Sequence, residues 1–298
     1  MKALKTGLVL AFWGIVHGTA MASPSYSVDW DVPSAGAGSA SGGSFGVWDV
    51  IGQMDAGSFS GGTFSVNSGQ LSQPGLAGLP TRIVSGGRRI FYKGSGLGGD
   101  GLSADAADDA ALATDKSALL PGQTASFANI TSYPFGITGL MIDVEALPED
   151  ITDSDIQVKL GNSQTPATWG NAPTPTVTVR RGAGAGGSDR VTLAWASGAI
   201  QNQWVQTTIK ATPQSGLAAD DVFYFGNSIG DTGNSATNFE VNAVDVTATR
   251  LNVSFDPVPV TSPFDISRDG SVNSTDVVYV RLNLSVVPSR VLVRLVAP

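Results

Sequence analysis

The chain contains no cysteine and a single histidine, His17. Without cysteine it has no disulfide to stabilise it and no thiolate to act as nucleophile or metal ligand. Beyond His17 the chain also lacks imidazole, which excludes a serine–histidine–aspartate triad, a cysteine–histidine pair and a zinc site built on either residue. What remains is oxygen chemistry, because Asp and Glu total 25. Carboxylates, amides and hydroxyls suit hard cations, above all calcium.

Long apolar runs are also missing beyond residue 22, where no stretch approaches the ~18 residues of a membrane-spanning helix. The first 22 residues combine Lys2 and Lys5, an apolar stretch over 7–16 and the small-residue site 20–22. That order is typical of a secretory signal peptide, so we expect an extracellular protein, secreted or attached to the cell surface. The net charge of −8 disfavours nucleic acid and anionic membranes as partners.

Three segments follow the signal peptide 1–22. Residues 23–80 are rich in Gly and Ser, and the sequence 41–47 recurs in similar form at 60–66, which predicts short β-hairpins or a flexible spacer. Residues 81–226 predict a β-sandwich, since short apolar stretches alternate with Gly, Pro, Asn and Asp. Residues 227–298 differ in character and carry the motifs described below. The predicted fold class is mainly β.

The strands expected in the β-sandwich are 89–92, 123–127, 139–145, 156–160, 176–180, 190–195, 204–211 and 222–225. An alanine-rich stretch, 104–119, predicts one interrupting helix. It carries Asp105, Asp108, Asp109 and Asp115, which read either as a solvated acidic helix start or as a calcium site completed by Asp100.

Residues 265–276 place oxygen donors at the spacing of a calcium-binding loop. The side-chain donors at positions 1, 3, 5, 9 and 12 are Asp265, Ser267, Asp269, Asn273 and Asp276, and Ser271 would offer its backbone carbonyl at position 7. Gly270 at position 6 permits the sharp turn that wraps such a loop around one ion. A plain Asp-Gly surface turn without metal is the alternative. The stretch 275–284 then predicts a helix, capped by Ser274 or Thr275.

A second, weaker copy of this pattern lies thirty-one residues earlier, because 241–252 matches 272–283. The same register puts Asn234, Asn238, Glu240, Asn242 and Asp245 at ligand positions of a first loop. This copy has fewer carboxylates and no Gly at position 6, so we expect weaker calcium binding, aided by Asp231 or absent.

Two such loops, each followed by one helix and joined by a proline-containing linker, resemble the dockerin type I module over about 227–284. Dockerins are similar in having Asp at position 12. The resemblance implies calcium-dependent folding and docking to a cohesin, in assemblies that degrade polysaccharides. It also implies partner recognition by Ser274 and Thr275. The first copy has Ala243 and Val244 at these positions, so another cell-surface protein is the alternative partner.

The sequence therefore favours a non-catalytic extracellular protein that docks through a calcium-binding tail. One alternative is a carbohydrate-binding β-sandwich, in which aromatic side chains either form a platform for sugar rings or belong to the core. The candidates for that platform are Trp169, Trp195, Trp204 and Tyr224.

A glycoside hydrolase is the least favoured alternative. It requires two carboxyl groups roughly 5–10 Å apart in a cleft. Glu145 and Glu149 are close in sequence, but they flank Pro148 in an apparent turn, where no cleft is implied.

Overall fold

A computed structural model of the chain describes residues 60–61, 64–65, 81–98, 105–286 and 291–298. The chain divides into two compact units, Met1–Pro74 and Gly75–Pro298. In the first unit, β1 (Ser60–Gly61) pairs antiparallel with β2 (Phe64–Ser65), as the predicted hairpin of the second repeat requires. The predicted signal peptide 1–22 and the rest of 23–80 lie outside the described residues.

The described part of the second unit is mainly β and contains two sheets. The four-stranded sheet is antiparallel in the order β3 (Arg82–Ile90), β5 (Gly139–Glu145), β9 (Asp189–Ala194) and β8 (Thr176–Arg180). The five-stranded sheet has the order β4 (Ile130–Thr131), β11 (Asp221–Asn227), β10 (Trp204–Ile209), β6 (Ile156–Gly161) and β7 (Gly170–Asn171). In it, only the β4–β11 pair is parallel. The mainly-β prediction is confirmed.

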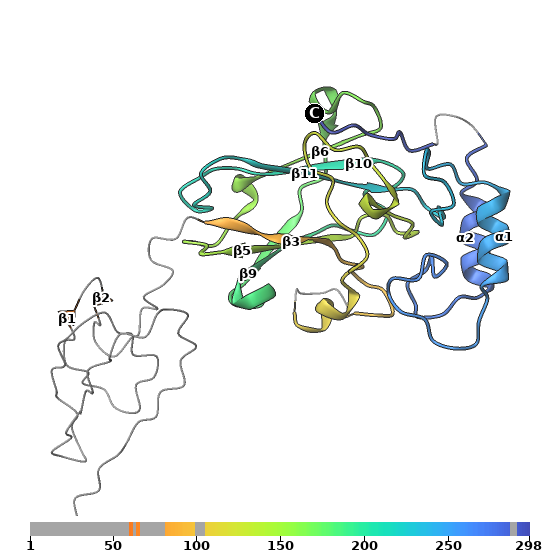
Figure 1. Ribbon diagram of the computed structural model, residues 1–298, viewed down its shortest axis with the longest axis horizontal. Coiled ribbons are helices and arrows are strands. Elements are labelled where there is room, and N and C mark those ends of the chain that lie inside the picture. Colours follow the sequence, from red (N-terminus) through yellow and green to blue (C-terminus); the bar gives the residue numbers. More distant parts are fainter. Residues whose placement is uncertain (1–59, 62–63, 66–80, 99–104, 287–290) are drawn as a thin grey trace, which may run out of the picture. The chain divides into compact units, whose positions relative to one another are not determined.

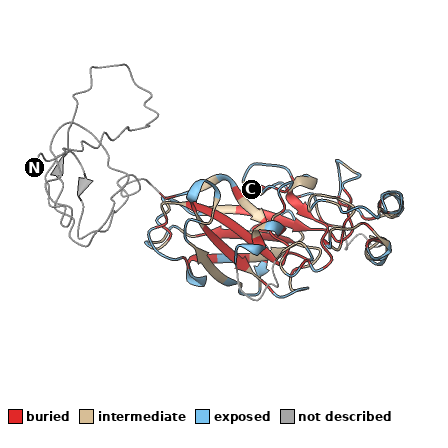
Figure 2. Ribbon diagram, turned by 90° about the horizontal axis from the view of Figure 1, so that it is seen from below, coloured by how far each residue is buried: buried red, intermediate tan, exposed pale blue. Residues whose placement is uncertain are grey.

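One hydrophobic core draws side chains from both sheets. Ile142 and Leu193 of the four-stranded sheet belong to the same buried cluster as Val205 and Phe223 of the five-stranded sheet. Figure 1 shows β3, β5 and β9 in one layer and β6, β10 and β11 in the other, and Figure 2 shows buried residues along the strands. β5 is buried almost throughout because it lies inside its sheet and faces this core.

Six predicted strands appear nearly where the sequence placed them. β5 and β8 have the predicted bounds, and β6, β9, β10 and β11 differ from them by two residues or fewer at each end. β3 begins earlier than the predicted strand 89–92 and ends at Ile90. The predicted strand 123–127 is wrong, because only Thr124 forms a bridge there, to Val296.

The predicted helix 104–119 is also wrong for residues 105–119. Only Ala107–Ala111 forms a short 3-10 helix, η1. Beyond η1 the chain makes a turn at 114–115 and pairs with distant segments: Ala113 N donates to Ile90 O at 2.9 Å, and Leu119 N donates to Tyr224 O at 3.0 Å. Pairing with strand ends and burial of these apolar side chains outweigh the helix propensity of alanine.

Two α-helices follow the sheets and pack against each other, α1 (Ala243–Leu251) and α2 (Ser274–Leu282). They lie side by side at one end of the unit (Figure 1). Asn273, rather than Ser274 or Thr275, caps α2, because its side-chain oxygen accepts a hydrogen bond from Thr275 N at 2.7 Å. Among the described residues, no helix has the length and apolar character needed to cross a membrane.

The last residues return to the five-stranded sheet. Trp204 Nε1 donates to Val293 O at 2.8 Å, and Ala125 N donates to Leu295 O at 2.8 Å. Leu292, Leu295 and Ala297 are buried in one cluster with Trp204. The segment 227–298 therefore belongs to the same compact unit as the sheets, instead of forming a compact unit of its own.

Candidate metal site

The loop 265–276 brings its first and last acidic residues together. Asp265 and Asp276 are both 0% exposed. Ser267 joins them: its backbone N donates to Asp276 Oδ1 at 2.9 Å, and its hydroxyl donates to Asp265 Oδ1 at 3.3 Å. Two buried carboxylates thus lie around one residue, although eleven positions separate them in the sequence.

Backbone donors fix the orientation of the Asp265 carboxylate. Asp269 N donates to Asp265 Oδ1 at 3.2 Å, and Gly270 N donates to Asp265 Oδ2 at 2.9 Å. Gly270 has a φ of 86°, a left-handed conformation that permits this turn. Burial raises the pKa of Asp265, and the N–H of Gly270 opposes that shift. A divalent cation beside this carboxylate would favour its ionised form.

The remaining loop residues lie nearer the surface. Asp269 is exposed, and its Oδ1 accepts a hydrogen bond from Ser271 N at 2.9 Å. Asn273 caps α2, and its own backbone N donates to Asp276 Oδ2 at 2.8 Å. Within the described ranges, no group of three or more His, Cys, Asp or Glu side chains is gathered closely enough to hold a metal ion. The loop therefore presents two buried carboxylates, with the third at its rim.

In the first loop, three of the predicted ligands lie on the surface. Asn234, Asn238 and Glu240 are exposed, and Glu240 N donates to Asn238 Oδ1 at 3.1 Å. The other two hold the start of α1: Asn242 caps the helix, and Asp245, which is fully buried, accepts from Asn242 N at 2.9 Å.

Thr232 joins Asp245 to its loop, and Asp231 precedes Thr232 in the chain. Thr232 donates to Asp245 Oδ1 from its backbone N at 3.0 Å and from its hydroxyl at 2.7 Å, much as Ser267 donates to Asp276. Asp231 is 2% exposed, and its Oδ2 has no hydrogen-bond partner among the described residues. The sequence register missed this pairing because the loop from Asp231 to Asp245 is longer than a twelve-residue loop.

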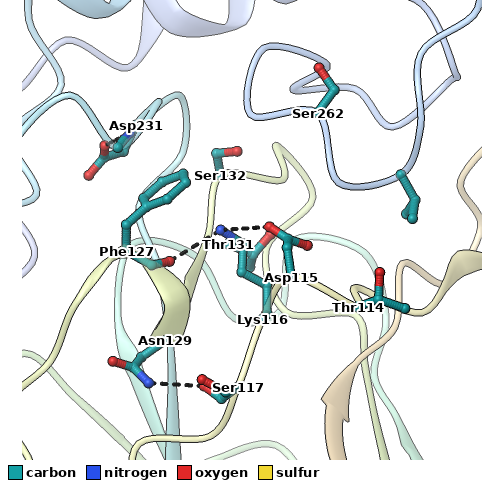
Figure 3. A network of polar contacts seen from close by, with 12 residues as sticks. Thr114, Asp115, Lys116, Ser117, Phe127, Asn129, Thr131, Ser132, Asp231 and Ser262 are labelled. Carbon is teal, nitrogen blue, oxygen red and sulfur yellow. Dashed lines mark hydrogen bonds and ion pairs between the residues drawn. The ribbon is translucent and has the colours of Figure 1, made fainter.

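A buried lysine lies on the other side of a phenylalanine ring from Asp231 (Figure 3). Lys116 is 1% exposed, and its Nζ is 3.2 Å from Phe127 O, 3.2 Å from Asp115 Oδ2 and 3.6 Å from the centre of the Phe127 ring. Burial lowers the pKa of Lys116, and the Asp115 carboxylate opposes that shift. Asp231 thus has a cation in its vicinity but forms no direct ion pair with any residue that the structure describes.

Without calcium, the protein is expected to lose stability as the pH rises from about 4 to about 7. Burial raises the pKa of Asp231 to about 7, so the folded chain favours its protonated form. The contribution of protonated Asp231 to the free energy of unfolding is fully present below the ordinary pKa of aspartate. It is lost as the pH rises through about 7, a change on the order of a few kcal/mol. Asp265, whose pKa burial also raises, acts in the same direction.

The measurement is the melting temperature in chelator at about pH 5 and about pH 8. Asp231→Asn should remove most of the difference, because an amide does not ionise in this range. Asp256→Asn, at an exposed position between the two loops, should keep it. A wild-type melting temperature that is equal at both pH values would contradict the expectation.

The predicted docking residues Ser274 and Thr275 are exposed at the start of α2. Large exposed apolar side chains are concentrated over the helical region of the described chain. They are Val244, Leu251, Val253, Phe255, Val278, Leu282 and Val286.

The aromatic residues proposed as a sugar platform are buried. Trp195, Trp204 and Tyr224 are at most 3% exposed and Trp169 is 7% exposed. Each polar tip has a protein partner: Trp195 Nε1 donates to Pro173 O at 2.8 Å, and Trp169 Nε1 donates to Ser163 Oγ at 3.0 Å. They belong to the core clusters, which was the alternative reading of these residues.

The acidic residues near η1 are engaged in ion pairs and hydrogen bonds. Asp109 pairs with Arg180 and with Arg190, which lies 2.9 Å away, and Asp115 pairs with Lys116. The carboxylate of Asp108 is buried and accepts a hydrogen bond from Asp105 N at 3.2 Å. Asp100 lies outside the described residues. These contacts support a structural role for the cluster.

Glu145 and Glu149 do not form a pair in a shared site. Glu145 Oε2 is 2.6 Å from Arg82 Nε, and Glu149 is exposed.

No protein-family model, curated protein or solved structure matches this chain. The functional argument therefore depends on the residues of the two loops and on the helices that follow them.

Proposed function

We propose that the chain is an extracellular, non-catalytic β-sandwich protein whose C-terminal part binds calcium in the loop 265–276 and docks to a partner. The observation that carries the proposal is the joining of Asp265 and Asp276 through Ser267. Two buried carboxylates beside each other are costly unless a cation compensates them.

The donor set fits calcium. All candidate ligands offer oxygen, and they number six with the carbonyl of Ser271, within calcium's range of six to eight. They are Asp265, Ser267, Asp269, Ser271, Asn273 and Asp276. The hydrogen bonds that Asp269, Gly270 and Asn273 donate to the end carboxylates resemble the outer contacts that orient metal ligands. Magnesium, which demands a strict octahedron, fits a flexible loop of this kind less well.

The helical surface supports docking. α1 and α2 pack side by side, and their exposed faces include Val244, Leu251, Val278 and Leu282. Ser274 and Thr275 lie at the same end of α2 as the loop. Because the C-terminal part of the chain resembles dockerins, we infer that its partner is a cohesin-like module in an assembly that degrades polysaccharides.

Calorimetric titration of the full chain tests the calcium part of the proposal. We expect saturable binding of calcium at millimolar concentrations or below, roughly the range of extracellular calcium modules, and much weaker binding of magnesium.

Docking is measured as retention of the protein on an immobilised cohesin in the presence of calcium. We expect retention to be lost in chelator and to be weakened by Thr275→Arg. The control is Gln157→Arg, at an exposed position of β6, which should leave retention unchanged. Absence of calcium binding would refute the proposal.

The two alternatives receive less support. Burial of the tryptophans leaves the carbohydrate-binding reading without its aromatic platform. Glu145 forms an ion pair with Arg82 and Glu149 is exposed, so these two glutamates do not supply the carboxyl pair that the hydrolase reading needs.

A further inference from the structure

Arg268, the fourth residue of the loop 265–276, points into the part of the chain that forms the sheets. It is 1% exposed. Its Nη2 donates to Ser132 Oγ at 3.2 Å, and its guanidinium carbon is 4.8 Å from the centre of the Tyr92 ring. Its Nη1 donates to Val260 O at 3.2 Å and to Ser262 O. Among the described residues, Arg268 forms no ion pair with a carboxylate.

The backbone of Arg268 is held from the same side. Gly96, in the turn that follows β3, donates its N–H to Arg268 O at 3.1 Å. A Cβ at Gly96 would lie 3.1 Å from Asp269 Cα, so the two segments are in close contact. Arg268 itself has a φ of 56°, a left-handed conformation that a non-glycine residue keeps only when its surroundings enforce it. The backbone oxygen and the guanidinium group of Arg268 are thus both in contact with residues of the sheet region.

The neighbours of Arg268 in the chain are two candidate calcium ligands, Ser267 and Asp269. Ser267 joins Asp265 to Asp276, and Asp269 N donates to Asp265 Oδ1 at 3.2 Å. Movement of the Arg268 backbone would displace these oxygens and donors together. Calcium coordination tolerates variation in geometry, but it needs its ligands to converge on one point.

We propose that Arg268 is a positioning residue that couples the loop to the sheet region, so that calcium binding and the contacts of Tyr92, Gly96 and Ser132 stabilise each other. The inference rests on the proposed calcium site and adds a role for a residue that is not a ligand. Thermodynamic linkage makes the coupling reciprocal: if the sheet contacts strengthen calcium binding, calcium strengthens the sheet contacts by the same factor.

Arg268→Lys separates positioning from charge. Lysine keeps the positive charge but loses the planar fork that reaches two carbonyls and a hydroxyl at once. If Arg268 positions the loop, Arg268→Lys should bind calcium about 10-fold more weakly than the wild type, in the lower range for residues that orient metal ligands. If Arg268 acts only through its charge, Arg268→Lys should bind calcium as tightly as the wild type. Arg268→Ala should then bind calcium more tightly, because it removes a cation near the site. Arg281→Lys, exposed on α2, is the matched control and should bind as the wild type does.

The experiment is calorimetric calcium titration of the full-length variants, together with amide hydrogen exchange of the wild type in calcium and in chelator. We expect the Gly96 amide to exchange about 10-fold more slowly in calcium, because its acceptor belongs to the loop. Unchanged affinity in Arg268→Lys would overturn the coupling and leave the proposed calcium site intact. If that variant does not fold, unchanged Gly96 exchange in the wild type overturns the coupling. A wild type that binds no calcium would refute both proposals.

Discussion

Asp265→Asn is expected to lower the calcium affinity of the chain by about 100-fold or more, beyond the effect typical of residues that only orient ligands. The substitution keeps the shape of a fully buried side chain but removes its charge and one acceptor. The melting temperature in chelator should change little. The loss of a hydrogen bond from Asp269 N or Gly270 N opposes the gain from no longer burying a carboxylate.

Calorimetric titration and melting temperatures with and without calcium measure both effects. Asp256→Asn is the control, because that residue is exposed and lies outside both loops. Calcium affinity within about twofold of the wild type in Asp265→Asn would show that this carboxylate is not a ligand. A large loss of melting temperature already in chelator would point instead to a purely structural role.

Trp204→Ala is expected to destabilise the second compact unit by about 3–5 kcal/mol, the usual cost of truncating a buried tryptophan. The side chain is fully buried, and its ring centre is 6.2 Å from that of Phe239. Its indole N–H also holds Val293 O at 2.8 Å, so the substitution should release the segment 291–298 from the sheet. Because domains are stable by only about 5–15 kcal/mol, the effect is large.

Urea denaturation gives the change in the free energy of unfolding, and hydrogen exchange at Ala125 N–H and Ala297 N–H reports release of the segment. Trp204→Phe keeps most of the buried ring and should cost less. Phe255→Ala, at a fully exposed side chain, should change stability by no more than about 0.5 kcal/mol. A cost below about 1 kcal/mol for Trp204→Ala would mean that the tail is held by other contacts.

The strands were predictable where side-chain alternation and turn residues agree with burial. β5 and β8 have the bounds that the sequence indicates, because Gly and Pro lie at or near their ends and each pairs along its whole length. The stretch 105–119 was mistaken for a helix because alanine composition is a local signal. The partners of its backbone, Ile90 and Tyr224, lie far away in the sequence.

The sequence placed Asp265 and Asp276 in one loop because only eleven positions separate them, and in the structure both contact Ser267. Calcium binding by this loop stays a prediction. The contact of Thr232 with Asp245 was not predictable, because thirteen positions separate the two residues and the twelve-residue register does not include Thr232. For the same reason the sequence marked Arg268 only as one residue within a loop. Its partners Tyr92 and Ser132 are more than a hundred residues away.

By itself, the sequence determined that the chain has no thiol and a single imidazole, since residue types do not depend on folding. It also determined the strand-rich class and the order of donors in one loop, both of which follow from spacing between near neighbours. Only the tertiary structure decided that the helical tail packs as one unit with the sheets and that the tryptophans are internal. Burial and long-range hydrogen bonds depend on which distant segments meet, and neither composition nor spacing encodes that directly.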